Sequence, residues 1–258
     1  MHVDGATPAV LGALRDRIPS DHILTSSERI GPGGARNRLN LAAPTPWIAH
    51  FDDDSYPCQT DFFAQAADVL ARHDSPDLAV VAAHFPSHEP PPPNGNPTRA
   101  MEFVGCGHLM RKAWFVKCPG YLPRSLAYNF EEVDLCLQLH ALGARILRAP
   151  SLEVWHEHRA AERTHPDIAV ATLVNTFLFP MVRYPLTLLP LVLLPGLHRC
   201  LWLARRGEPL HLAPAIRELL ASGPFLRTYR RPVSARAVLS WLRQRKAISQ
   251  PKPSSAAA

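Results

Sequence analysis

Cysteine is scarce in this sequence, and its spacing is irregular. The 258 residues include five cysteines, none of them in a Cys-x-x-Cys pair. We therefore expect neither a disulfide framework nor a zinc site, and a reducing compartment fits better.

The N-terminus lacks the basic-then-apolar pattern of a signal peptide, so we expect no export. The longest uncharged run after Arg183 is Tyr184 to Leu197, 14 residues, which is short of the roughly 20 that span a bilayer as a helix.

Acidic residues are scarce toward the C-terminal end. Residues 1–204 hold 17 Lys and Arg against 20 Asp and Glu, whereas residues 205–258 hold 11 against 2. The net charge of +6 therefore comes from the last stretch. A basic segment can serve nucleic acid or an anionic membrane surface. This one follows an apolar stretch and lacks the interleaved aromatics of a stacking platform, so we expect an anionic membrane surface and no nucleic acid.

Strand-like and helix-like segments alternate over the first 160 residues. Hydrophobic residues make up 47% of the chain, enough for a packed core. We predict buried strands at 47–51 and 78–85 and two further strands at 144–150 and 151–158, with helices at 33–43, 58–73 and 131–143. This alternation predicts an α/β domain over residues 1–160.

The next region, residues 161–204, is apolar for most of its length. Pro185, Pro190 and Pro195 would kink a helix there. We expect a membrane-surface or re-entrant helical segment, and the alternative is a helical hairpin packed on the domain. Residues 205–258 form the basic C-terminal tail.

Three consecutive acids, Asp52, Asp53 and Asp54, follow the predicted strand at 47–51. In open α/β sheets ligands bind outside the carboxyl ends of the strands. Carboxylates two residues apart can point into one site there, where a divalent cation would relieve their repulsion. The alternative is that Asp54 or Ser55 caps the next helix.

Two other groups of polar residues could take part in chemistry. Glu131, Glu132 and Asp134 begin a predicted helix, where acids favour the helix dipole. Three acids in four residues exceed what capping needs, and a carboxylate near other negative charge suits a general base. His156 closes a predicted strand and could ligate a metal, with His158 on the same face as a rival. The alternative is a structural histidine.

The order of these segments resembles that of the family 2 glycosyltransferases. The matching stretches are "GPGGARNRLNLA", "WIAHFDDDSYP", "FVGCGHLMRKAWF", "CPGYLPRSLAYNFEEVDLCLQL" and "APSLEVWHEH". The resemblance covers roughly residues 1–160. It implies a GT-A-like, Rossmann-like mixed sheet flanked by helices, to which this chain adds the apolar helical region and the basic tail.

The resemblance also implies a set of roles. Asp52, Asp54 and His156 would hold Mn²⁺ or Mg²⁺, and Glu132, with Glu131 beside it, would be the general base. The nucleotide-sugar-binding residues would be Asp4, Arg36, Asn37, Asp52, Asp53, Gly105, Gly107, Gly120 and Tyr121.

Family members usually begin with an apolar strand, a turn and a helix, and this chain starts with what looks like the end of the second strand, at Asp4. We therefore expect a GT-A-like domain without its first strand-helix unit. The first functional hypothesis is an inverting transferase on the cytoplasmic face of the cell membrane. It would move a sugar from a nucleotide-diphosphate-sugar to a lipid-linked or envelope-glycan acceptor. The alternative hypothesis is a catalytically inactive, membrane-associated binding protein.

Overall fold

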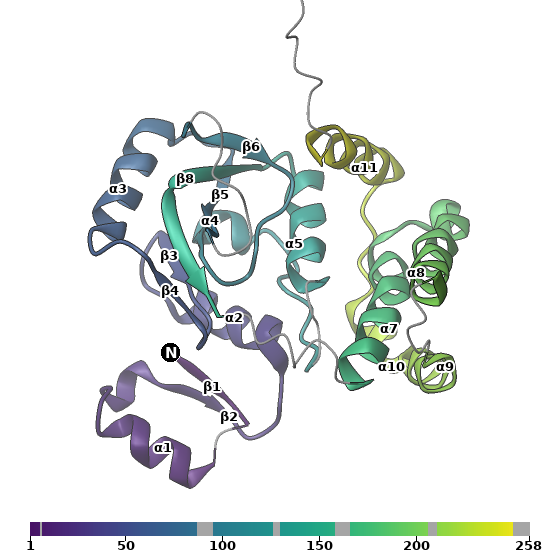
Figure 1. Cartoon of the computed structure of the whole chain (residues 1–258), viewed down its shortest axis with the longest axis horizontal. Coiled ribbons are helices and arrows are strands. Elements are labelled where there is room, and N and C mark those ends of the chain that lie inside the picture. The colour runs from purple at the N-terminus through teal and green to yellow at the C-terminus, as the bar shows by residue number, and fades with distance from the viewer. Residues whose placement is uncertain (6, 87–94, 126–129, 158–165, 206–210, 250–258) are drawn as a thin grey trace, which may run out of the picture.

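A mixed β-sheet lies at the centre of the computed structural model, which describes residues 1–5, 7–86, 95–125, 130–157, 166–205 and 211–249 (Figure 1). Its strands are Trp47–His50 (β3), Ser55–Pro57 (β4), Leu78–His84 (β5), Thr98–Ala100 (β6), His108–Arg111 (β7) and Arg145–His156 (β8). The strand order is β3-β7-β5-β8-β4, and β6 also pairs with β8. β5 and β8 are parallel, whereas the remaining pairs are antiparallel.

Helices cover both faces of this sheet. Helix α3 (Phe62–His73) buries Phe62, Ala66 and Val69 in the core on one face. Helix α5 (Phe130–Ala141) contributes buried leucines to the core on the other face. Every residue of β5 is consequently buried, as expected for a strand covered on both sides. Helix α2 (Gly31–Ala42) precedes β3, and the short helix α4 (Lys112–Phe115) follows β7.

The β8 region differs from the prediction, because one strand of 12 residues replaces the two expected at 144–150 and 151–158. Pairing with β5, β6 and β4 along its length keeps β8 continuous. The sequence pattern also missed β4, which lies between the predicted strand at 47–51 and the predicted helix at 58–73. In the β4–β8 register Ser55 pairs with His156, and the residue before Ser55 is Asp54. The rival ligand His158 lies outside the described residues.

The N-terminal residues form a small unit of their own below the main sheet (Figure 1). Strands β1 (His2–Asp4) and β2 (Leu24–Ser26) pair in parallel as a separate two-stranded sheet. Helix α1 (Pro8–Arg15) and the 3₁₀ helix η1 (Ser20–His22) connect them. The unit leads directly into α2, so it sets where that helix begins.

The C-terminal third is helical: α7 (Pro166–Arg183), η2 (Leu186–Val192), α8 (Leu193–Arg205), α9 (Leu212–Ala221), α10 (Gly223–Tyr229) and α11 (Ala235–Ser249). Phe179 of α7, Trp241 of α11 and Leu137 of α5 share one buried cluster. Part of the predicted basic tail is therefore packed on the α/β domain. In the described parts of the chain, no helix has the length and apolarity needed to cross a membrane.

Candidate active site

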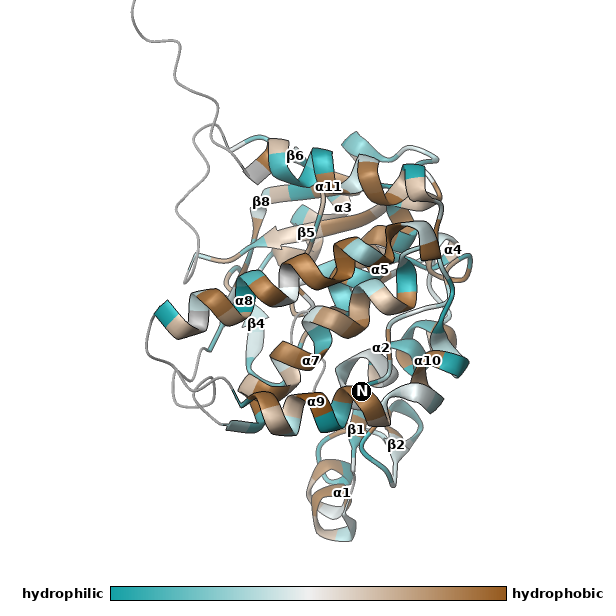
Figure 2. Cartoon of the chain, turned by 90° about the vertical axis from the view of Figure 1, so that its right-hand side faces the viewer, coloured by the Kyte–Doolittle hydropathy of each residue, from teal (hydrophilic) through white to brown (hydrophobic). Residues whose placement is uncertain are grey.

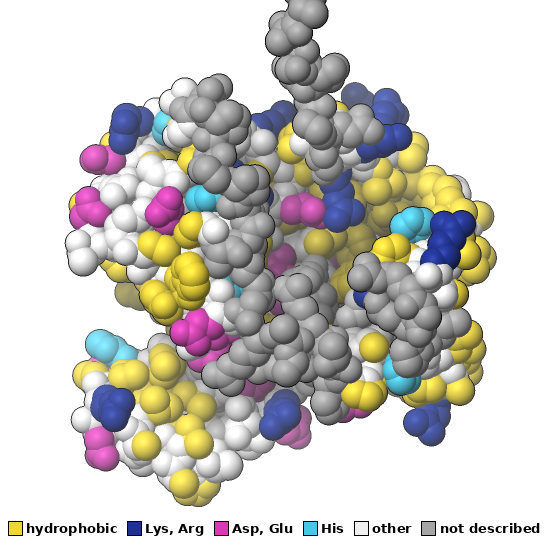
Figure 3. Space-filling view, viewed as in Figure 1, with side chains coloured by type: hydrophobic (Ala, Val, Ile, Leu, Met, Phe, Trp, Pro, Cys, Tyr) yellow, Lys and Arg dark blue, Asp and Glu magenta, His cyan; other side chains and the backbone are white. Residues whose placement is uncertain are grey.

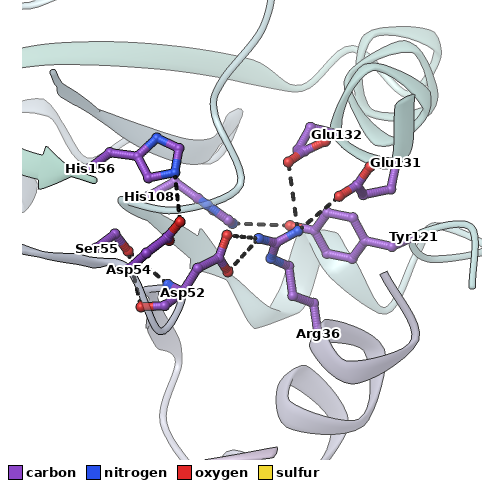
Figure 4. A network of polar contacts seen from close by, with 9 residues as sticks. All are labelled: Arg36, Asp52, Asp54, Ser55, His108, Tyr121, Glu131, Glu132 and His156. Atoms are coloured by element: carbon purple, nitrogen blue, oxygen red, sulfur yellow. Dashed lines mark hydrogen bonds and ion pairs between the residues drawn. The ribbon is translucent and has the colours of Figure 1, made fainter. Parts of the chain in front are cut away.

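The buried Arg36 stands among three acids, of which Glu131 and Glu132 are buried and Asp52 is partly exposed (Figure 4). Its Nη2 donates to both carboxylate oxygens of Asp52, at 2.7 and 2.8 Å. Its Nη1 donates to Oε1 of Glu131 at 3.2 Å and lies 3.6 Å from Oε1 of Glu132. The guanidinium thus joins the end of β3 to the first turn of α5. Burial works against the charged form, but the three carboxylates outweigh it and raise the pKa of Arg36.

The start of α2 explains why Arg36 reaches this position. The carboxylate of Asp4 accepts hydrogen bonds from the backbone N–H groups of Ile30 and Gly31 and from the Ser26 hydroxyl, each at 2.8 Å. Burial opposes ionisation, but these hydrogen bonds prevail and lower the pKa of Asp4. Asp4, predicted to bind the nucleotide sugar, is therefore engaged at the entry to α2.

Asn37, the neighbour of Arg36, fixes the turn at Gly120 and Tyr121. Its Nδ2 donates to the carbonyl of Tyr121, and its Oδ1 accepts from the Tyr121 N–H, both at 2.8 Å. Gly120 has a φ of +91°, and a Cβ there would lie 2.7 Å from the Asn37 Oδ1, so the turn needs glycine. These predicted residues do lie together, and the Arg36 Cζ is 5.9 Å from the centroid of the Tyr121 ring.

The two glutamates face Arg36 from the first turn of α5. Both are buried, and within the described residues the Oε2 of each has no hydrogen-bond partner. Burial, together with the adjacent Glu131, raises the pKa of Glu132 well above its usual value. Gly105 leaves room for this arrangement, since a Cβ there would lie 2.1 Å from the Glu132 Oε1 and 2.5 Å from the Arg36 Nη2. Gly107, the other predicted glycine, has a φ of +97° beside Phe85 and Val154.

Asp54 and His156 form a second pair on the more open side of the site. Their Oδ2 and Nε2 atoms are 3.4 Å apart. The pairing of β4 with β8 brings them together, since the N–H of Glu157 also donates to the carbonyl of Asp54 at 2.8 Å. Burial raises the pKa of Asp54, although His156 counteracts the shift. Asp53 is exposed between the other two acids.

The predicted metal ligands are only partly assembled. Within the described residues, no group of three or more His, Cys, Asp and Glu side chains could hold a metal ion. Arg36 occupies both oxygens of Asp52, whereas Asp54 and His156 are the two predicted ligands that the structure brings together. Magnesium is commonly bound through one or two carboxylates plus substrate phosphates and water. Asp54 supplies one such carboxylate, and the imidazole of His156 faces it.

Sequence reasoning missed a layer of neutral histidines in contact with these residues. The Nε2 of His108 lies 3.0 Å from the Tyr121 hydroxyl, and its ring stacks on His50 at a centroid distance of 4.7 Å. His50 in turn contacts Asn40 at 3.2 Å. Burial, reinforced by Arg36, lowers the pKa of His50 to about 3. The available signal was a histidine at the end of β3 and another at the start of β7.

Comparison with solved structures identifies the fold. The structure of GalNAc-T7 with UDP, GalNAc and Mn²⁺ aligns with a TM-score of 0.54 at 13% identity, covering 72% of this chain and 41% of that one. The mannosyltransferase PcManGT from Pyrobaculum calidifontis, solved with GDP-Man and Mn²⁺, aligns with a TM-score of 0.51 at 12% identity, covering 96% and 77%. The chain thus spans about two fifths of GalNAc-T7.

No protein-family model and no curated protein sequence matches the chain. The structural likeness confirms the predicted fold: the chain has a GT-A-like mixed α/β fold.

Proposed function

We propose that this chain is a metal-assisted glycosyltransferase that moves a sugar from a nucleotide-diphosphate-sugar to a hydroxyl group. The observation that carries the proposal is the arrangement around Arg36. The Asp54–His156 pair and the buried Glu131–Glu132 pair lie on two sides of this arginine, in a GT-A-like fold. Solved structures of similar fold hold UDP or GDP-Man with Mn²⁺, which supports a nucleotide-sugar donor here.

Glu132 is the general base of the proposed reaction. It takes the proton of the acceptor hydroxyl while that oxygen bonds to the anomeric carbon and the bond from this carbon to the diphosphate breaks. Attack from the side opposite the leaving group inverts the anomeric carbon. Burial and the adjacent Glu131 raise the pKa of Glu132, and this makes its ionised carboxylate a stronger proton acceptor than an exposed glutamate. Within the described chain its Oε2 has no hydrogen-bond partner, so this oxygen could accept a hydrogen bond from the acceptor hydroxyl.

Glu131 differs from Glu132 in its contact with Arg36. Its Oε1 accepts a hydrogen bond from Arg36 at 3.2 Å, whereas the Glu132 Oε1 is 3.6 Å away. We therefore assign Glu131 to positioning Arg36 and Glu132 to proton transfer. Arg36 limits the repulsion among the acids and holds Asp52 in place.

Asp54 and His156 would hold the Mn²⁺ or Mg²⁺. When bound, the cation neutralises charge on the leaving nucleoside diphosphate. Asp52 supports the site through its contact with Arg36, so the proposed metal ligands are Asp54 and His156 and no longer include Asp52.

The acceptor that we propose is lipid-linked or an envelope glycan, and we propose that the protein acts at the cytoplasmic face of the cell membrane.

Calorimetric titration with UDP-, GDP- and dTDP-sugars tests the donor site. In the presence of Mn²⁺ we expect one of these donors to bind. Binding should weaken at least about tenfold in EDTA or in Asp54→Asn, because the cation that Asp54 and His156 would hold is needed to bind the diphosphate. Asp68→Asn is the matched control, since this acid is exposed on α3, lies outside the proposed site and should leave binding unchanged. If no donor binds, or if binding ignores both the metal and Asp54, the proposed site is wrong.

A further inference from the structure

An apolar surface on the C-terminal helices faces away from the α/β domain. We call it the outer leucine surface; its members on α8 and α9 are Leu193, Leu194, Leu197, Leu201, Trp202, Leu212, Ile216 and Leu220. All are exposed, and Leu197 and Leu220 reach 61% and 79%. Figure 2 shows α8 and α9 on the face turned toward the viewer, and Figure 3 shows hydrophobic side chains along the same margin.

Helical spacing collects these residues on outward faces. Leu193, Leu197 and Leu201 recur every four residues along α8, as Leu212, Ile216 and Leu220 do along α9. The inward faces are already packed on α7. A Cβ on Gly196 of α8 would meet the Phe177 ring at 1.9 Å, and Ala215 of α9 lies in a buried cluster with Leu173 and Val174. The outward leucines are therefore additional to the residues that dock these helices.

The charges near the outer leucine surface are positive. Arg199 and Arg205 lie on α8, and Arg217 lies on α9. In the described parts of these two helices the only acid is Glu218, and it is bound to Arg124 of the domain at 2.7 Å. The wider segment of residues 205–258 carries 11 basic and 2 acidic residues. An exposed apolar face bordered by arginines matches an anionic lipid surface, where leucines enter the interface and arginines meet the head groups.

We propose that the outer leucine surface docks this protein on an anionic lipid bilayer, with α8 and α9 lying in the plane of the interface. A second copy of the chain is the competing occupant. A self-associated face would bring the same arginines of two copies toward one another, which opposes pairing. Docking in the interface also requires no spanning helix, and none is found in the described chain. The proposal rests on this surface alone and does not depend on the proposed chemistry.

Vesicle sedimentation of the full chain tests the proposal. We expect binding to phosphatidylcholine vesicles that contain phosphatidylglycerol, and weaker binding to pure phosphatidylcholine or at high salt, because salt screens the arginines. The double substitution Leu197→Asp and Leu220→Asp should lower binding at least about tenfold, because two apolar side chains that would be buried in the membrane interface are replaced by charged ones. Leu41→Asp is the matched control, because Leu41 is 63% exposed on α2 and should leave binding unchanged.

Three results would overturn the proposal: no binding to anionic vesicles, equal binding by the double variant and the wild type, or a wild-type dimer that the double substitution dissociates. The last result would assign the surface to a second copy.

A second measurement, tryptophan quenching, does not require a charged residue to be introduced into the surface. Vesicles with brominated acyl chains should quench wild-type tryptophan fluorescence, and Trp202→Phe should remove most of that quenching. Quenching that is absent, or that persists in Trp202→Phe, contradicts insertion of α8.

Discussion

At the scale of single residues, the site places three carboxylates against one guanidinium. Arg36 contacts Asp52, Glu131 and Glu132 within 3.6 Å. Glu131 and Glu132 are buried, whereas Asp52 is partly exposed and also shares the charge of Arg36. One guanidinium cannot balance all three carboxylates, so protonation of one buried acid relieves the excess. Burial and the Glu131 carboxylate favour that proton on Glu132. Glu132 acts as the base only in its ionised form, and its raised proton affinity then favours transfer of the substrate proton to it.

The pH dependence of stability tests the state of Glu132. Because its pKa is raised above the usual value of 4.5 in the folded protein, its contribution is fully present below that value and is lost as pH rises through the folded pKa. Glu132→Gln keeps a neutral side chain at every pH. We expect urea unfolding to show the variant gaining about 1–3 kcal/mol relative to wild type between about pH 5 and pH 8. An identical pH dependence for both proteins would show that Glu132 is already ionised at pH 5.

Replacement of Arg36 tests whether it holds the acids together. Arg36→Ala leaves buried carboxylates without their partner, so we expect the free energy of unfolding to fall by about 3–5 kcal/mol. The matched control is Arg38→Ala on the same helix, because Arg38 is exposed and donates to the Thr25 carbonyl; its loss should cost about 1 kcal/mol or less. Urea unfolding measures both losses. Equal losses in the two variants would show that Arg36 does not stabilise the folded protein through its contacts with the acids.

At the scale of elements, one buried ion pair ties the α/β domain to the C-terminal helices. Asp134 of α5 accepts from the Arg183 Nε at 2.5 Å and from its Nη2 at 2.8 Å. Arg183 ends α7 and also donates to the Arg231 carbonyl. Since α5 carries Glu131 and Glu132 in its first turn, this pair helps to set the position of the proposed base.

Single and double substitutions separate the ion pair from its packing. Arg183→Met alone leaves the Asp134 carboxylate buried without its partner, and we expect a loss of about 3–5 kcal/mol in the free energy of unfolding. Adding Asp134→Leu removes that carboxylate, so the double variant should recover most of the loss. A double variant as unstable as Arg183→Met would mean that side-chain shape, and not the unpaired charge, causes the loss.

The elements themselves were largely predictable from local patterns. The helices over 58–73 and 131–143 and the strands over 47–51 and 78–85 appear as α3, α5, β3 and β5, because their apolar periodicity matches the faces they bury. The short strand β4 was missed, since its three residues pair with β8 almost 100 positions away. Such pairing depends on long-range register, which a local window does not contain.

The grouping of several candidate residues was predictable, but the hydrogen bonds among them were not. The motif order placed Arg36, Asn37, Glu131, Glu132 and His156 in the site, and these residues do converge there. The sequence could not reveal that Arg36 occupies Asp52, because both residue types are common in binding sites and the contact depends on how α2 meets β3. The sequence also could not reveal that the side chains of Asp4 and Asn37 form hydrogen bonds with backbone groups of the protein.

At the scale of the whole molecule, α7 connects two proposed functional surfaces. One face of the C-terminal helices meets α5 through Asp134–Arg183 and the cluster around Trp241, and the other carries α8 and α9 with the outer leucine surface. Figure 1 shows α7 to α10 beside α5, on the side of the molecule away from α3. A protein docked through the outer leucine surface would therefore hold its sheet above the bilayer. That arrangement suits the lipid-linked acceptor class that we propose.

Nucleoside diphosphate release tests the central claim most directly. With Mn²⁺ and the donor found by calorimetry, we expect the wild type to release the diphosphate, using water where no acceptor is supplied. Glu132→Gln should slow release by about 10²–10⁴-fold with unchanged donor affinity, because a general base acts on the reaction and not on donor binding. Asp68→Asn, the exposed control on α3, should match the wild type. Donor binding without release by the wild type, or equal rates for Glu132→Gln and wild type, would contradict glycosyl transfer by this site.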